Sequence, residues 1–181
     1  IKGTSDISQI AGSKIVIITA GSPRKPGMSR EDLIKTNGKV ISDIAKKIAA
    51  LSPEAIIKVL THPMDVMTYL LHKVSKIPSN RILGVGGILD SGRFASVITK
   101  ATNTSPDQVF ALVIGMHGNL MVPLPRHSTI YGQSLSNILS QETIESLVTQ
   151  TVRGGAKIVE LLQTGSAYFA PAAAVVNMVS C

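Results

Sequence analysis

Hydrophobic positions follow two alternating patterns in the first half of the chain, and together they predict strands and helices in regular alternation. Continuous apolar runs such as KIVIITA are typical of strands buried in a parallel sheet. Apolar residues spaced three and four apart are typical of amphipathic helices. The expected strands are residues 15–19, 55–60 and 81–85, and the expected helices begin at residues 31, 63 and 89. This order predicts an α/β fold, a doubly wound parallel sheet with right-handed crossovers.

The pattern changes beyond residue 105, where shorter β-prone pieces precede two helices. The expected elements are a strand over residues 109–114, the β-prone segments MVPL and HSTIYG, a long helix over 142–163 and a last helix from about Pro171. This mixture is typical of an α+β domain. We therefore expect a parallel-sheet domain over residues 1–104 and an α+β domain over residues 105–181.

All three expected strands of the parallel sheet end in polar or glycine-rich loops. The loops read AGSPRKPG, THPMD and GVGGILDSGR. Because the carboxyl ends of parallel strands meet at one edge of the sheet, ligands bind in the crevice outside that edge. The sequence therefore predicts a binding site formed by these loops.

Composition supports a globular protein and narrows its partners. Hydrophobic residues make up 44% of the 181 residues and charged residues 16%, which excludes a disordered chain. The formal net charge of +7 raises the question of nucleic acid, but the cations are scattered and only 3% of the residues are aromatic. Little is left for base stacking, so we expect no nucleic-acid partner.

Membrane association is not expected either, because the apolar stretches are far shorter than the roughly 20 residues that span a bilayer. Cys181 is the only cysteine, which rules out an intrachain disulfide and a cysteine zinc site. This usage is typical of a reducing compartment. We expect a cytoplasmic protein, with an organelle as the alternative because the chain does not begin with Met.

Three residues could carry proton transfer and carboxylate binding. His117 lies in GMHGN at the end of an expected strand, where it could exchange a proton or be a loop histidine bonded to backbone. Asp90 and Arg93 are three residues apart in LDSGRF, so they face the same way on the expected helix. They could orient an imidazole and grip a substrate carboxylate. Taken alone, the residues favour an ordinary exposed ion pair.

The loop GSPRKPGMSR, residues 21–30, carries Arg24, Lys25 and Arg30 directly after the first expected strand. Prolines stiffen the loop and glycines give it hinge freedom, which suits a lid over an anionic ligand; a solvated loop is the alternative. His62, in LTHP, is either a ligand contact or a pre-proline loop residue. We expect no metal, because no H-x-x-x-H motif or acidic cluster is present, and GVGG is not the G-x-G-x-x-G phosphate fingerprint.

Five stretches, in order, are similar to the malate/lactate dehydrogenase family, and within it to the bacterial-type malate dehydrogenases that resemble lactate dehydrogenases. They read IVIITAGSPRKPGMSREDLI, VLTHPMDVMTY, GVGGILDSGRF, IGMHGNLMVPLPRHSTI and RGGAKIVELLQTGSAYFAPAAAV. The resemblance implies part of a Rossmann-type parallel sheet followed by an α+β catalytic domain. We expect from it that the family's first strand, its G-x-G-x-x-G turn and its last helix lie outside this chain.

The resemblance also implies a role for each matching residue. His117 matches the proton donor and acceptor, and Asp90 the carboxylate that orients it. Arg93 matches the arginine that binds the substrate's C1 carboxylate through two hydrogen bonds, and Arg30 the arginine that polarises the reacting carbonyl. Arg24 falls at the specificity position, where arginine pairs with a second carboxylate and favours a small dicarboxylic acid.

The cofactor implied by the resemblance is NAD, contacted by Asn37, Leu60, Thr61 and His62. His62 stands where the family has an Asn that bonds substrate and helps fix the nicotinamide, so it counts as a substrate contact as well. The expected function is an NAD-dependent malate dehydrogenase of the tricarboxylic acid cycle, a homodimer or homotetramer that interconverts malate and oxaloacetate. The alternatives are a lactate dehydrogenase and a non-catalytic remnant that keeps an anion pocket or an oligomer interface.

Overall fold

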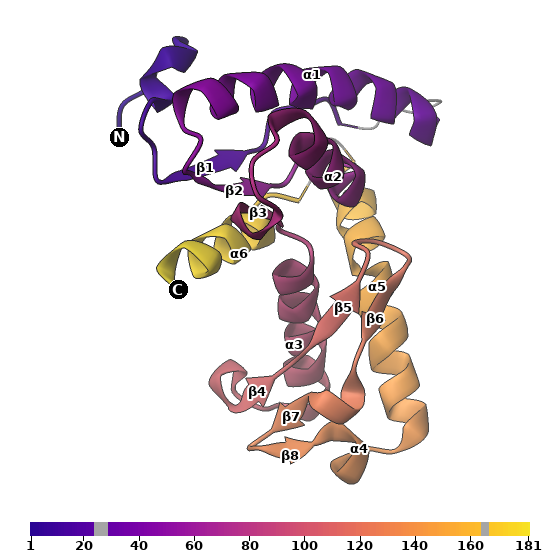
Figure 1. The fold of residues 1–181 in the computed structure, drawn as a ribbon. Coiled ribbons are helices and arrows are strands. Elements are labelled where there is room, and N and C mark those ends of the chain that lie inside the picture. The colour runs from indigo at the N-terminus through magenta and orange to yellow at the C-terminus, as the bar shows by residue number, and fades with distance from the viewer. Residues whose placement is uncertain (24–28, 164–166) are drawn as a thin grey trace. The chain divides into compact units, whose positions relative to one another are not determined.

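The protein was analysed as a computed structural model, which describes residues 1–23, 29–163 and 167–181, with Arg30 described by its backbone alone. The chain divides into two compact units, Ile1–Val85 and Gly86–Cys181 (Figure 1). The first unit is α/β and the second is α+β, which confirms the predicted fold class.

The first unit is built on a parallel sheet of three strands. Its strands are β1 (Ile15–Ile18), β2 (Ile56–Val59) and β3 (Ile82–Gly84), and they pair in the order β1-β2-β3. Helix α1 (Arg30–Leu51) joins the first pair and α2 (Met64–Ser75) the second, and the short 3-10 helices are η1 (Ile7–Ile10) and η2 (Ser79–Arg81). All three carboxyl ends therefore lie at the same edge of the sheet.

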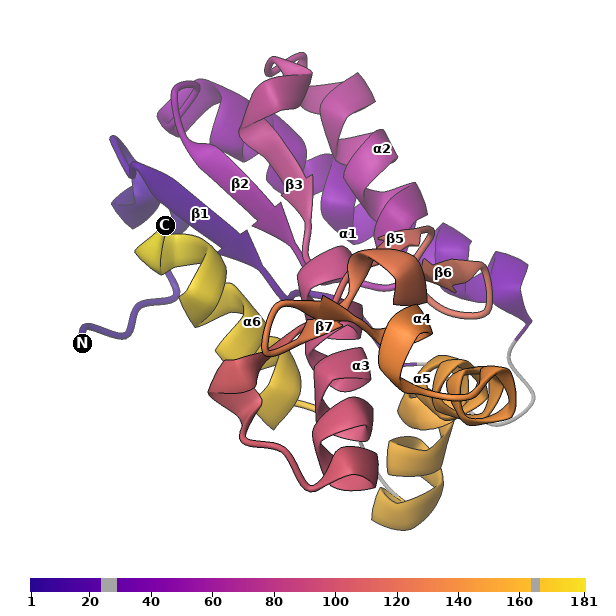
Figure 2. The same ribbon diagram turned by 90° about the horizontal axis from the view of Figure 1, so that it is seen from below.

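Both long helices of this unit pack on one face of the sheet. Ile57 and Val59 of β2 are fully buried against Ile41 of α1 and Met67 of α2. Figure 2 shows the sheet with α1 and α2 on one side of it. Burial of these aliphatic side chains is the main term that stabilises the unit.

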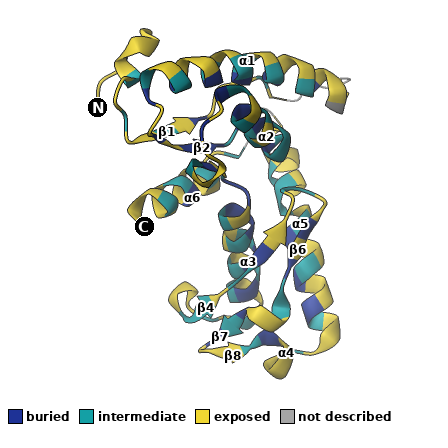
Figure 3. Cartoon of the chain, in the orientation of Figure 1, coloured by how far each residue is buried: buried dark blue, intermediate teal, exposed yellow. Residues whose placement is uncertain are grey.

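The prediction that these strands are buried holds for the face that α1 and α2 cover and is wrong for the opposite face. Ile15, Ile17, Ile56 and Leu83 are exposed, by 37%, 45%, 42% and 40% respectively. Successive side chains of a strand point to opposite faces, so a continuous apolar run supplies both faces while α1 and α2 cover only one. The exposed residues of β1 are visible in Figure 3.

The second unit combines helices with short antiparallel strands. Its helices are α3 (Gly87–Thr102), α4 (Leu135–Ile138), α5 (Gln141–Leu162) and α6 (Phe169–Ser180), with 3-10 helices η3 (Pro106–Gln108) and η4 (Pro125–His127). Its strands are β4 (Val109–Phe110), β5 (Val113–Gly115), β6 (Met121–Pro123), β7 (Thr129–Ile130) and β8 (Gln133–Ser134). Phe94, Ile98, Leu135 and Leu147 form the centre of its core.

The single strand expected over residues 109–114 is split in two. Its first part, β4, pairs with β7, whereas its second part, β5, pairs with β6 in a separate hairpin. Between them the Leu112 N–H donates to the Ser128 hydroxyl oxygen instead of to a strand. An apolar run shows that a segment is extended, but it does not show which partner each part takes.

Along the chain, the boundary between the two compact units falls between Val85 and Gly86, whereas the sequence placed it near residue 105. The difference is helix α3, which packs on α5, α6 and β5. A strand–helix alternation in sequence assigns α3 to the parallel sheet, but its contacts belong to the second unit.

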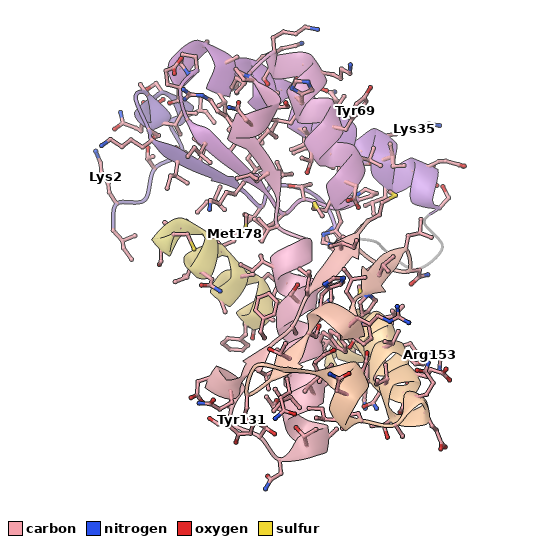
Figure 4. All side chains as sticks on the ribbon, turned by 60° about the horizontal axis from the view of Figure 1, so that its bottom comes forward. Lys2, Lys35, Tyr69, Tyr131, Arg153 and Met178 are labelled. Atoms are coloured by element: carbon pink, nitrogen blue, oxygen red, sulfur yellow. The ribbon has the colours of Figure 1, made fainter. Side chains whose placement is uncertain are left out.

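Two properties of the described residues concern membranes and charged partners: the character of the helices and the distribution of cationic side chains. Across the described segments, no helix combines the length and the apolar character needed to cross a membrane. The side chains of Lys2, Lys35 and Arg153 come from three different elements, the N-terminal segment, α1 and α5 (Figure 4). One of the tyrosines, Tyr69, lies under the Lys73 ammonium, 5.2 Å from its ring centroid.

Candidate active site

Asp90 is the centre of a hydrogen-bonded group in the second unit. It lies in the first turn of α3 and is 1% exposed. Its two carboxylate oxygens have different partners: Oδ2 is 2.7 Å from Nδ1 of His117, and Oδ1 accepts a hydrogen bond of 3.1 Å from Nη1 of Arg93. One buried carboxylate therefore holds an imidazole and a guanidinium at the same time.

His117 reaches Asp90 because β5 is fastened to α3. The strand ends at Gly115, two residues before the histidine, and its Val113 N–H donates to the Ser91 hydroxyl oxygen at 3.0 Å. Ser91 follows Asp90 in the sequence, so the hydrogen bond to Ser91 holds β5 next to the turn of α3 that carries the carboxylate. Because an ionised carboxylate only accepts hydrogen bonds, Nδ1 of His117 carries a proton and Nε2 is the nitrogen that can exchange one.

Arg93 uses only part of its guanidinium to bind Asp90. Its side chain is 14% exposed, and within the described residues Nη1–Asp90 is its one hydrogen bond. Its Nε is buried and has no hydrogen-bond acceptor among the described residues. Nε–H and one N–H of Nη2 point along the same edge, the fork that fits a carboxylate. A buried donor without a partner is costly, so the edge is suited to an acceptor from a ligand.

In the first unit, Asn37 ties together the loops that follow β1 and β2. It lies on α1 and is 1% exposed. Its Oδ1 accepts from the Ser22 N–H at 2.8 Å, and its Nδ2 donates to the carbonyl oxygens of Ser22 at 3.1 Å and His62 at 2.6 Å. Both amide hydrogens are thus committed to backbone, and the two loops are held at the carboxyl edge of the sheet.

A second set of contacts joins the same loops. The Thr61 hydroxyl donates to the Ala20 carbonyl at 2.7 Å, and Nδ1 of His62 lies 2.9 Å from the Leu60 carbonyl oxygen. The backbone at Gly21 passes so close that a Cβ there would lie 2.7 Å from Cγ2 of Thr61. The structure therefore brings Asn37, Leu60, Thr61 and His62 together.

Family models match both units. Residues 1–84 match the NAD binding domain of lactate/malate dehydrogenase, and residues 88–181 match its alpha/beta C-terminal domain. The chain belongs to the lactate/malate dehydrogenase family. The two matches divide the family member close to the boundary between its compact units.

Individual members of the lactate/malate dehydrogenase family are similar to this chain over nearly its whole length. A malate dehydrogenase of Methanosarcina mazei is 52% identical over 178 residues, which are 98% of this chain and 58% of that protein. The apo malate dehydrogenase of Picrophilus torridus superposes with a TM-score of 0.91 at 42% identity, over 96% of this chain and 54% of that one. A Cryptosporidium parvum lactate dehydrogenase in complex with lactic acid and NAD superposes with a TM-score of 0.92 at 37% sequence identity, over 98% of this chain and 57% of that one. The chain thus spans just over half the length of the relatives it matches.

The predicted site residues of this family member fall into three groups. Asp90, Arg93 and His117 form one hydrogen-bonded group, and the four expected cofactor residues form another. Arg24, with Lys25, lies outside the described residues, and of Arg30 only the backbone at the start of α1 is described. In the described part of the chain, no group of His, Cys, Asp or Glu is arranged to hold a metal ion.

Sequence reasoning missed the residues that act through their contacts. The Ser22 backbone bonds the side chain of Asn37, and the Ser91 hydroxyl accepts from the backbone of β5. Both serines lie inside quoted stretches, GSPRKPGMSR and LDSGRF, but neither was singled out. Their only sequence signal is that each lies next to or near a residue singled out for other reasons. Taken alone, the spacing of Asp90 and Arg93 favoured an ordinary intrahelical ion pair, and only the resemblance gave them roles in a site; both side chains are largely buried.

Proposed function

We propose that the protein is an NAD-dependent malate dehydrogenase, which transfers hydride reversibly between malate and NAD to give oxaloacetate and NADH. The bridging carboxylate of Asp90 is the observation that carries the proposal, because it pairs a proton-exchanging histidine with a carboxylate-binding arginine. Malate dehydrogenase is the name of the Methanosarcina relative at 52% identity, which supports this reaction over other 2-hydroxy acid oxidations.

His117 supplies the proton chemistry. In the reducing direction, the carbonyl oxygen of oxaloacetate becomes an alkoxide as the hydride arrives, and the imidazolium donates its Nε2 proton to that oxygen. In the oxidising direction, neutral Nε2 accepts the hydroxyl proton of malate. Asp90 holds Nδ1 at 2.7 Å, which fixes the ring orientation and stabilises the imidazolium.

Arg93 orients the substrate. Its Nε–Nη2 edge, which has no hydrogen-bond partner among the described residues, binds the C1 carboxylate in a bidentate manner, and the bond from Nη1 to Asp90 keeps the guanidinium from rotating. The same carboxylate therefore positions the proton donor and the substrate anchor. Holding the proton donor and the bound substrate in one fixed orientation supplies a large part of the rate acceleration of such a site.

The cofactor residues fit NAD at the carboxyl edge of the parallel sheet. When bound, NAD accepts or donates the hydride. Leu60, Thr61 and His62 form the loop that would run beside the nicotinamide end, and Asn37 holds that loop against the one after β1. Since both amide hydrogens of Asn37 are bonded to backbone, it serves the cofactor by positioning the loop.

A small dicarboxylic acid is the proposed substrate, with Arg24 pairing with its second carboxylate and Arg30 polarising the carbonyl. The test uses the protein expressed from its complete coding sequence. Turnover of NADH should be faster with oxaloacetate than with pyruvate, and Arg24→Gln should narrow the difference, since it removes the charge that pairs with the second carboxylate. Faster turnover with pyruvate would make the protein a lactate dehydrogenase, and no NADH binding by the folded protein would make it a non-catalytic remnant.

We include a homodimer or homotetramer in the proposal. Supporting it are large apolar side chains on the helices of the second unit that stay exposed, among them Leu161 of α5 and Phe169 and Val176 of α6. Light scattering during size-exclusion chromatography should give twice or four times the mass of one chain, and a single-chain mass would contradict this part of the proposal.

A further inference from the structure

Helix α5 contains two adjacent glycines, Gly154 and Gly155, in its interior (Gln141–Leu162). Glycine is a poor residue for a helix interior, since it loses more backbone freedom than alanine and packs no side chain. Neither glycine has a positive φ that would require it. The reason for at least one of them is therefore a neighbour that comes close to the helix.

That neighbour is Arg93, and it approaches the two glycines differently. A Cβ at Gly155 would lie 3.3 Å from Nη1, 3.5 Å from Nη2 and 3.6 Å from Cζ of Arg93. A Cβ at Gly154 would meet only Cδ of Arg93, at 3.8 Å, an ordinary van der Waals contact. The guanidinium head thus rests beside Gly155, and the aliphatic stem rests beside Gly154.

From this contrast we propose that Gly155 is a positioning residue for the substrate-binding arginine. A methyl group at 3.3 Å from Nη1 would move the guanidinium by a few tenths of an ångström. The movement would strain the bond from Nη1 to Asp90, which is already 3.1 Å long. It would also turn the Nε–Nη2 edge away from the substrate carboxylate, and binding sites lose affinity on displacements of this size.

The inference rests on the proposed function in one respect, the role of Arg93 as carboxylate anchor. Two variants, Gly155→Ala and Gly154→Ala, separate positioning from helix stability. Both replace a glycine in the same helix turn by a better helix former, so both should keep or raise Tm. Only Gly155→Ala places its methyl against the guanidinium.

Steady-state kinetics of the complete protein should show the difference. Gly155→Ala is expected to raise KM for oxaloacetate by about tenfold, with KM for NADH unchanged, and Gly154→Ala is expected to change neither. In an Arg93→Lys background, which has no planar guanidinium, Gly155→Ala should have no further effect on KM. Equal KM values for the two alanine variants, or an unchanged effect in the lysine background, would overturn the proposal.

A second readout does not depend on activity. The Arg93 Nε–H resonance in a 1H–15N spectrum should shift in Gly155→Ala and stay in place in Gly154→Ala. If the resonance shifts in neither variant, the positioning role is overturned. If the wild-type protein shows no turnover but the resonance still shifts in Gly155→Ala, only the proposed function is contradicted. Should Gly155→Ala fail to fold, restoration of folding by Arg93→Lys would support the contact, and failure to restore it would overturn the proposal.

Discussion

Asp90 gives each of its two carboxylate oxygens a separate task, because Oδ2 faces the imidazole of His117 and Oδ1 faces the guanidinium of Arg93. It is buried, so neither interaction is screened by water as a surface ion pair would be. The carboxylate therefore couples His117, the proposed proton donor, to Arg93, the proposed substrate anchor, and a change at this one residue should disturb both.

Asp90→Asn tests this coupling. The amide is nearly the same size, but it can donate a hydrogen bond to Nδ1 and thus leave the proton on Nε2, the wrong tautomer for accepting one. We expect kcat for malate oxidation to fall by about 10²- to 10⁴-fold, and KM for the substrate to rise because Nη1 of Arg93 loses its charged partner. Steady-state kinetics measure both, with near-ultraviolet circular dichroism as the control for folding. A variant that retains wild-type kcat would show that Asp90 does not orient His117.

Much of the residue-scale arrangement was predictable, for identifiable reasons. Asp90 and Arg93 are three apart on a helix, which fixes their common direction without any knowledge of the fold. Their burial was not predictable from that spacing, because it depends on α5 and β5 packing over α3. The bond between Asp90 and His117 spans 27 residues, and it was expected only through the resemblance to the family.

At the scale of elements, helix α1 shows how local chemistry fixes a boundary. Ser29 is its N-cap: the hydroxyl accepts from the Asp32 N–H at 3.0 Å, and the Asp32 carboxylate accepts from the Ser29 N–H at 3.2 Å. The Ser29 hydroxyl also donates to that carboxylate at 2.6 Å. The two hydrogen bonds that the Asp32 carboxylate accepts from Ser29 lower its pKa below the usual value, the bond from the hydroxyl being the largest cause.

Ser29→Ala should weaken this helix start. Loss of the cap is expected to lower the free energy of unfolding by about 1 kcal/mol at neutral pH, measured by urea denaturation, while Ser29→Thr keeps the hydroxyl and serves as the control. Because the pKa of Asp32 is lower in the folded state, its contribution is present above the unfolded value and is lost as the pH falls through the folded one. An NMR titration should show the pKa of Asp32 rising in Ser29→Ala; an unchanged pKa would contradict the capping box.

Elements were predictable to different degrees. Helix α5 was expected over residues 142–163 and is found at Gln141–Leu162, because its period is long and regular. The segment 109–114 divides between two sheets, because a two- or three-residue strand is decided by its partners rather than by its own sequence. The open face of β1 could not be predicted either, since an apolar run does not say how many of its faces the chain covers.

At the scale of the whole molecule, the parallel order β1-β2-β3 places the carboxyl ends of the three strands, where the loops that the sequence singled out begin, at one edge of the sheet. Two of those loops are tied together by Asn37. The hydrogen-bonded group of Asp90, Arg93 and His117 lies within the second unit, where α3 packs on α5 and β5. Each unit thus holds its own group of hydrogen-bonded candidate residues, and a separate family model matches each unit.

The role of His117 is tested most directly by steady-state oxidation of NADH with oxaloacetate, measured for the protein expressed from its complete coding sequence and for His117→Gln. Wild type should consume NADH with formation of an equimolar amount of malate. His117→Gln should still bind NADH, as seen by fluorescence, but should lose about 10²- to 10⁴-fold in kcat. A glutamine variant as fast as wild type, or a folded wild-type protein that forms no malate, would contradict the proposed malate dehydrogenase.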